Sequence, residues 1–184
     1  MKNETLGNLS HLPEPLIDTV RSRAHGHLQA VRLAMQGLGI DSLIGSRPSP
    51  ERERLCALIA AHVIAPHTKL ATTRWWHSTT LAEEFGVAAT DEDEVYGAMD
   101  RLLERQPVIE RKLAARHLGE GSFALYDLSS SYFEGAHCPL GRIGHSRDGK
   151  KNKPQVNYGL LTNRVGCPVA VSVYPGNTAD ASRW

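Results

Sequence analysis

The sequence QVNYGLLTNRVGCPVAVSVY at residues 155–174 decides the fold of the second half of the chain. Apolar residues alternate with small or polar ones over residues 156–160, and they do so again over residues 169–173. A period of two is typical of a strand that buries one of its faces. Because the short segment NRVG at residues 163–166 separates the two runs, the sequence predicts an antiparallel hairpin.

The chain before residue 119 follows a helical period instead. Apolar residues recur at helical spacing, and glycine or proline ends most of the runs. Thr90 is the predicted cap of a helix with an acidic first turn, and Pro107 is the predicted start of the next helix. The predicted helices cover one or two stretches within residues 16–38, then residues 51–65, 71–85, the stretch after Thr90, and residues 107–117.

A change of period at residues 119–121 separates these helices from the strands. Residues 123–128, FALYDL, are mostly apolar and are interpreted as a buried strand. The sequence therefore predicts an α+β chain, in which helices come first and three antiparallel strands follow. The predicted segments are an irregular and helical start at residues 1–45, a helical region at residues 46–118, and the strands at residues 119–184.

Composition excludes some classes of protein. With 41% hydrophobic and 22% charged residues and a net charge of +1, the chain is an ordinary globular protein, and its overall charge gives no argument for nucleic acid. The sequence has no signal peptide and no run of 18 apolar residues, which argues against secretion and membrane spanning. Three cysteines without a CxxC pair favour reduced thiols, so a cytoplasmic protein is predicted.

One loop, at residues 141–153, is strongly basic and is called the basic loop below. Its interpretation as a DNA contact competes with that of an ordinary solvated surface loop. Its position between the strand at residues 123–128 and the hairpin favours the functional interpretation. Its cations are Arg142, Arg147, Lys150, Lys151 and Lys153, with Asp148 as the single acid.

Asp127 is the leading candidate for chemistry. An acid among apolar strand residues is costly to desolvate unless a metal, a cation or hydrogen bonds compensate its charge. A strand-end acid of this kind is a candidate metal ligand, and the alternative is an Asx-turn with the serines that follow. A complete metal hydrolase would need a second acid, and the available ones, Glu134, Asp148 and Asp180, are poorly placed. His137, Cys138 and His145 have no familiar zinc spacing.

Two segments, YDLSSSYFEG at residues 126–135 and GHSRDGKKNKPQVNYGLLTNRVGCPVAVSVYPGNTAD at residues 144–180, resemble bacterial insertion-sequence transposases of the DDE type. The likeness extends upstream to HGH at residues 25–27 and to three further stretches. These are KLATTRWWHSTTLAEEFGV at residues 69–87, DEDEVYGAMDRLLERQ at residues 91–106 and RKLAARHL at residues 111–118.

The resemblance implies an RNase H-like catalytic domain whose first-strand acid, here Asp127, binds one of two divalent ions, Mg²⁺ or Mn²⁺. It implies DNA transposon ends as the substrate, and a second copy or an intact transposase as protein partners. The second catalytic Asp, expected in a run like GDRG, and the later Glu have no counterpart before Trp184. The expectation is therefore a truncated copy that is inactive alone, and the alternative is a non-catalytic DNA-binding or regulatory fragment.

Overall fold

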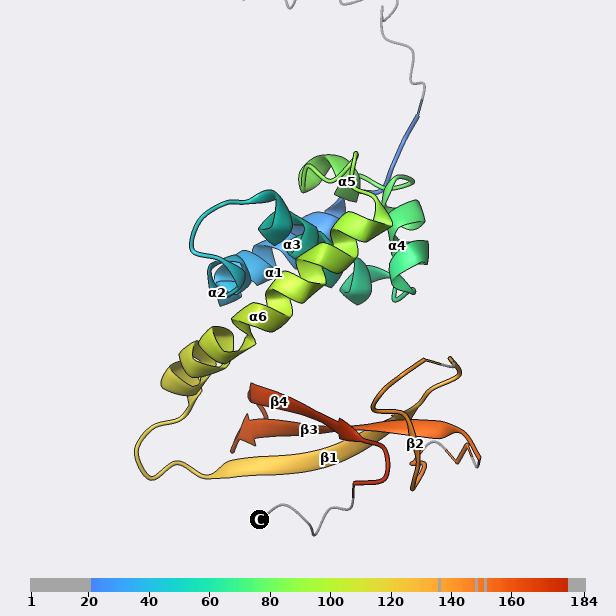
Figure 1. The fold of residues 1–184 in the computed structure, drawn as a ribbon. Coiled ribbons are helices and arrows are strands. Elements are labelled where there is room, and N and C mark those ends of the chain that lie inside the picture. Colours follow the sequence, from blue (N-terminus) through green and yellow to red (C-terminus); the bar gives the residue numbers. More distant parts are fainter. Residues whose placement is uncertain (1–20, 136, 148, 151, 179–184) are drawn as a thin grey trace, which may run out of the picture. The chain divides into compact units, whose positions relative to one another are not determined.

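The computed structural model describes residues 21–135, 137–147, 149–150 and 152–178. These residues form six helices and one four-stranded antiparallel sheet (Figure 1). The expectation of a mixed fold, with helices first and strands last, is confirmed. Lys151, Asp148 and Asp180 lie outside the described residues.

The chain divides into two compact units, and the division falls inside one helix. The helical unit comprises Met1–Asp41 and Pro48–Ala98, and the sheet unit comprises Ser42–Arg47 and Met99–Trp184. The boundary between Ala98 and Met99 lies within α6, Glu92–His117. The change of period at residues 119–121 corresponds to the gap between this helix and the first strand.

Most of the buried apolar side chains lie in the helical unit. It contains α1 (Gly26–Leu38), α3 (Pro50–Ile64), α4 (Lys69–Trp76), α5 (Leu81–Glu84) and the start of α6, while the short α2 (Ile40–Ile44) spans the division between the units. Its core includes Leu28, Met35, Leu55, Trp76, Leu81, Phe85, Val87 and Val95. No single described helix is long and apolar enough to span a membrane; α3 and α4 pass only when taken together, across a bend of 93°.

Side-chain caps set several of the helix starts. Ser49 Oγ accepts a hydrogen bond from Arg52 N at 3.2 Å, which fixes the start of α3. At the start of α6, Asp91 Oδ1 accepts from Glu94 N at 2.8 Å while Glu94 Oε2 accepts from Asp91 N at 3.2 Å, a reciprocal capping box. The prediction that Thr90 caps this helix is therefore wrong. Its hydroxyl instead accepts from Arg54 Nε at 3.3 Å.

Two other helix predictions need correction. The single helix expected over residues 71–85 is two, because Ser78 and Thr79 hydroxyls bond back to the carbonyls of Trp75 and Trp76 at 2.6 and 2.9 Å and end α4. Conversely, α6 continues through Pro107.

A stripe of side chains runs along one side of α6, both before and after the proline. Proline inside a helix costs about 3 kcal/mol. Pro107 is exposed and lies off the stripe of residues that runs along one side of α6 before and after it. The stripe comprises Met99, Leu102, Leu103, Gln106, Ile109, Glu110 and Leu113.

Cys56 is a buried thiol of the helical unit. Burial raises its pKa to about 11, and the neighbouring Glu53 carboxylate adds to this while Arg52 opposes it. The thiol therefore stays protonated at neutral pH and serves as a small apolar side chain.

The sheet is built around β3, Pro154–Asn163. One edge of β3 pairs with β1 (Ala124–Tyr132); the other pairs with β4 (Pro168–Pro175) and, at its start, with the two-residue β2 (Arg142–Ile143). The predicted hairpin of β3 and β4 is confirmed. Its turn is held by Asn163 Oδ1, which accepts from the backbone N–H groups of Val165 and Cys167 at 3.1 and 2.9 Å.

Alternation along the strands gives the sheet two faces, which are named here after a residue of β1. Residues paired across antiparallel strands share a face. The Asp127 face carries Leu125, Asp127, Ser129, Tyr158, Leu160, Val171 and Val173. The Tyr126 face carries Tyr126, Leu128, Ser130, Gln155, Asn157, Gly159 and Tyr174.

Much apolar surface of the sheet is exposed. Of the described apolar residues in its strands, Val169 alone is fully buried, whereas Leu125 is 58% and Val173 54% exposed. The prediction of a buried strand at residues 123–128 is wrong, because no described part of the chain covers this half of β1 and Phe123 before it is 78% exposed.

Candidate functional site

Asp127 is the fourth residue of β1 rather than its last, so the expected position at a strand end is wrong. The strand runs on to Tyr132 because β3 offers it a pairing partner as far as Gln155. Asp127 faces Leu160 across the strands, and Leu160 in turn faces Val171 of β4. Its side chain is exposed, so the desolvation cost expected for it does not arise.

No described carboxylate joins Asp127. Among the described residues, no three His, Cys, Asp or Glu side chains gather as a metal site would require. Glu134 is turned to Lys153, with Oε1 and Nζ 3.7 Å apart and both side chains largely exposed. The described residues therefore supply one exposed carboxylate, which can serve as a single ligand of a hydrated metal ion. A two-metal centre needs several carboxylates.

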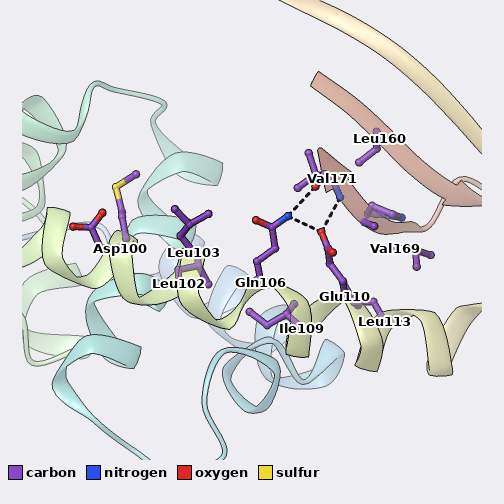
Figure 2. A pocket seen from close by; sticks show the side chains of 13 residues that line it. Asp100, Leu102, Leu103, Gln106, Ile109, Glu110, Leu113, Leu160, Val169 and Val171 are labelled. Atoms are coloured by element: carbon purple, nitrogen blue, oxygen red, sulfur yellow. Dashed lines mark hydrogen bonds between the residues drawn. The ribbon is translucent and has the colours of Figure 1, made fainter. Parts of the chain in front are cut away.

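An apolar groove of about 550 Å³ lies on the Asp127 face, between residues 99–113 of α6 and the hairpin of β3 and β4. Figure 2 shows Leu160, Val169 and Val171 on one side of it and the stripe of α6 on the other. Leu160 links the groove to Asp127, since it is the residue paired with Asp127 in the sheet. The groove is therefore a neighbour of the candidate carboxylate.

Two side chains of α6 bind the free edge of β4 (Figure 2). Gln106 Nε2 donates to Val171 O at 2.8 Å, and Glu110 Oε1 accepts from Val171 N at 3.1 Å. Gln106 Nε2 also lies 2.7 Å from Glu110 Oε1, which aligns the two side chains one helical turn apart. Together they occupy the donor and the acceptor that a further strand would use at this residue.

The basic loop is attached to the sheet at Ser130. The Ser130 hydroxyl donates to His145 O and accepts from Arg147 N, both at 3.4 Å. Further along the loop, Lys150 N donates to Ser146 Oγ at 3.0 Å. The loop backbone is thereby ordered next to the Tyr126 face, while the side chains of Arg142, Arg147, Lys150 and Lys153 are exposed.

Individual cations of this loop have local partners. Lys150 Nζ lies 5.7 Å from the centre of the Tyr132 ring, a cation–π contact, and Lys153 pairs with Glu134. Arg142 is held by β2, whose pairing with Gln155 was not predicted from the sequence. Exposed contacts of this kind contribute little to stability.

Close backbone contacts fix the loop relative to the end of β4. A Cβ on Gly144 would lie 1.9 Å from Gly176 O, and one on Gly176 would lie 1.9 Å from Gln155 O and 2.7 Å from Arg142 O. Only glycine fits at such distances. Gly176 N also donates to Leu140 O at 3.1 Å, which ties the turn after β4 to the segment before β2.

A third glycine lies beneath an aromatic side chain on the Tyr126 face. The Tyr126 ring crosses over Gly159, where a Cβ would meet its hydroxyl oxygen at 1.9 Å. The Tyr126 hydroxyl then reaches Tyr174 Oη at 3.1 Å. This contact spans all three long strands, and a glycine within a strand is the sequence signal for such a close approach.

Asp127 and the basic loop are therefore on different faces of the sheet at their points of attachment. Ser130, which binds the loop, lies on the Tyr126 face, and Asp127 lies on the other. The structure brings Arg147 and His145 together with Ser130 and Asn157. The sequence did not predict this group of four residues. The sequence also did not single out Gln106 and Glu110.

Comparison of the chain with protein-family models, with curated protein sequences and with solved structures finds no match.

Proposed function

We propose that this chain is part of a DDE-type DNA transposase, in which Asp127 is the first metal ligand and the basic loop binds DNA. The observation that carries the proposal is the arrangement of β1, β3 and β4 as an antiparallel sheet with an exposed carboxylate inside β1 and the basic loop between β1 and β3. An RNase H-like fold begins with three antiparallel strands of this kind. The sequence resemblance supplies the reaction class.

The chemistry assigned to the parent enzyme is metal-dependent cleavage and transfer of DNA strands at transposon ends. Mg²⁺ or Mn²⁺, when bound, would lower the pKa of a coordinated water and neutralise negative charge at the phosphate. Asp127 is available to such an ion, since no ion pair within the described residues involves it. The described residues hold no second carboxylate beside it, so we expect no strand cleavage by this chain alone.

The alternative is a DNA-binding or regulatory chain without catalysis, acting in the cytoplasm on the same DNA ends. The exposed cations of the basic loop support it, because DNA binding needs them and needs no metal. A second copy or an intact transposase is the proposed protein partner in both cases. Asp127 separates the two proposals, because binding alone does not use its carboxylate.

Metal binding at Asp127 is tested by paramagnetic broadening. We expect Mn²⁺ to broaden the backbone amide signals of Asp127 and of Leu160, its partner across the strands. Asp127→Asn should remove this broadening, whereas Asp100→Asn, an exposed acid of α6, should leave it unchanged. Broadening centred elsewhere, or unchanged in Asp127→Asn, would remove the catalytic assignment and leave the regulatory one.

DNA binding is tested by removing three described cations of the basic loop at once, Arg147→Gln, Lys150→Gln and Lys153→Gln. We expect weaker binding to duplex DNA, and a slope of log affinity against log salt concentration that is smaller by roughly two to three, about 0.9 for each lost phosphate contact. Fluorescence anisotropy at several salt concentrations measures both quantities.

The matched control removes three exposed cations elsewhere in the sheet unit, Arg101→Gln, Arg111→Gln and Arg164→Gln. It changes the net charge by the same amount. Equal losses in the two triple variants would mean that overall charge, and not the basic loop, governs binding, and the assignment of the loop would then fail.

A further inference from the structure

A small polar pocket of about 260 Å³ lies where the basic loop meets the Tyr126 face. Its walls come from β1, the loop, β3 and the turn after β4. The polar residues that line it are Ser129, Ser130, His145, Arg147, Asn157 and Thr178. It lies on the sheet face opposite to Asp127 and belongs to neither the metal site nor the apolar groove.

Asn157 is the residue that points to a ligand. Its side chain lines the pocket although the residue is only 6% exposed. Its Nδ2 donates to Thr178 O at 2.9 Å, which fixes the orientation of the amide. Its Oδ1 is then a buried acceptor with no hydrogen-bond partner among the described residues. A buried acceptor left unsatisfied is costly, so the pocket favours a group that brings an N–H or O–H donor.

The loop side of the pocket has the opposite preference. Arg147 carries a guanidinium that only donates hydrogen bonds, and His145 adds an imidazole. The Ser130 hydroxyl fixes the backbone of both residues at 3.4 Å, so these groups are presented by an attached segment of the loop. This side therefore suits an anion, and phosphate is the anion that arginine binds with directional hydrogen bonds.

A nucleotide offers both groups in one ligand, a phosphate and a base with N–H donors. In duplex DNA the Watson–Crick donors of the bases are already paired, whereas an unpaired nucleotide can present them to a pocket. We infer that the pocket formed by Ser130, His145, Arg147 and Asn157 takes one unpaired nucleotide of a DNA strand, with its phosphate at Arg147 and a base N–H at Asn157 Oδ1. This inference rests on the proposed DNA-binding function and specifies the form of DNA that the chain prefers.

The test uses the full chain and three fluorescently labelled DNA duplexes of one sequence. The first is blunt, the second carries one unpaired nucleotide at a 3′ end, and the third carries an abasic nucleotide at that position. We expect the unpaired nucleotide to tighten binding about tenfold, the effect of one hydrogen bond to an otherwise unsatisfied acceptor. The abasic duplex should bind like the blunt one.

A protein variant tests the same contact from the other side. Asn157→Leu removes the acceptor at similar volume, and it should abolish the preference for the unpaired nucleotide over the blunt duplex. The control is Thr162→Val, which removes a polar group from β3 on the opposite face. The abasic duplex tests the inference with the unaltered chain, so it remains decisive if Asn157→Leu does not fold.

The outcomes separate this inference from the proposed function. Binding to all three duplexes with equal affinity overturns the nucleotide pocket and leaves the DNA-binding function standing. Absence of binding to any duplex overturns both. A preference for the unpaired nucleotide that persists in the abasic duplex or in Asn157→Leu also overturns the assignment of Asn157.

Discussion

Gly176→Ala is expected to unfold the sheet unit while the helical unit stays folded. The new Cβ would lie 1.9 Å from Gln155 O and 2.7 Å from Arg142 O, both backbone atoms. Gln155 belongs to the central strand and is fully buried, so its carbonyl cannot move aside without disturbing the pairing of β3. Overpacking typically costs about 1–3 kcal/mol, and occasionally more. That is a large part of the stability of a small unit whose strands bury few apolar side chains.

The tyrosines allow the two units to be followed in one experiment. Tyr126, Tyr132, Tyr158 and Tyr174 belong to the sheet unit and Tyr96 to the helical unit. With 3-fluorotyrosine incorporated, ¹⁹F NMR during denaturant titration should show the four sheet signals lost early in Gly176→Ala. The Tyr96 signal should keep its midpoint.

Gly97→Ala is the matched control for this experiment. A Cβ there meets nothing within 4 Å, and the residue lies in the helical unit within α6. Alanine is favoured over glycine in a helix by about 1 kcal/mol, so the Tyr96 midpoint should rise. An unchanged midpoint of the four sheet signals in Gly176→Ala would contradict the close contact described for this turn.

Glu110→Ala is expected to open the edge of β4 and cause self-association. Glu110 accepts from Val171 N and aligns Gln106, which binds Val171 O. Loss of a hydrogen bond to a charged group costs about 1.5–3 kcal/mol. The larger effect follows from geometry, because the freed edge of an exposed apolar strand is a template for pairing with another chain. Analytical ultracentrifugation should show a larger average mass, and hydrogen exchange at the Val171 amide should become faster.

Two further variants sharpen this result. Glu110→Gln keeps an oxygen acceptor and should restore most of the protection at Val171. Glu104→Ala removes an exposed acid from the same helix and should change neither the mass nor the exchange. If Glu110→Ala stays monomeric with a protected Val171 amide, the two side chains do not shield this edge.

Local sequence patterns predicted those parts of the fold that local interactions determine. The hairpin of β3 and β4 follows from the alternation of apolar and polar residues and from a short turn. Both signals lie in residues that are close together in the sequence. The helix ends were harder to predict from the sequence. Ser78 and Thr79 end α4 through hydroxyl hydrogen bonds that compete with the helical pattern. Pro107 predicts a helix start because proline is common at the first position of a helix, whereas the structure has it inside the 26-residue α6.

The candidate site was predictable only in part, for the same reason. Asp127 was identified, but its exposure depends on what covers β1, which no local pattern states. Its face could have been compared with that of Ser130, because an odd separation along a strand places two residues on opposite faces. Other parts of the site depend on contacts between segments that are far apart in the sequence. These are the binding of the loop by Ser130 and the binding of Val171 by Gln106 and Glu110.

The bare apolar surface of the sheet has a consequence for the fate of the chain in a cell. Chaperones and proteases recognise exposed apolar segments, and their removal of a poorly covered protein competes with every interaction it makes. The amount of this chain in a cell is then set by its lifetime as well as by its rate of synthesis. A partner that covers the sheet would protect the chain from degradation. Its first effect would be a higher abundance of the chain.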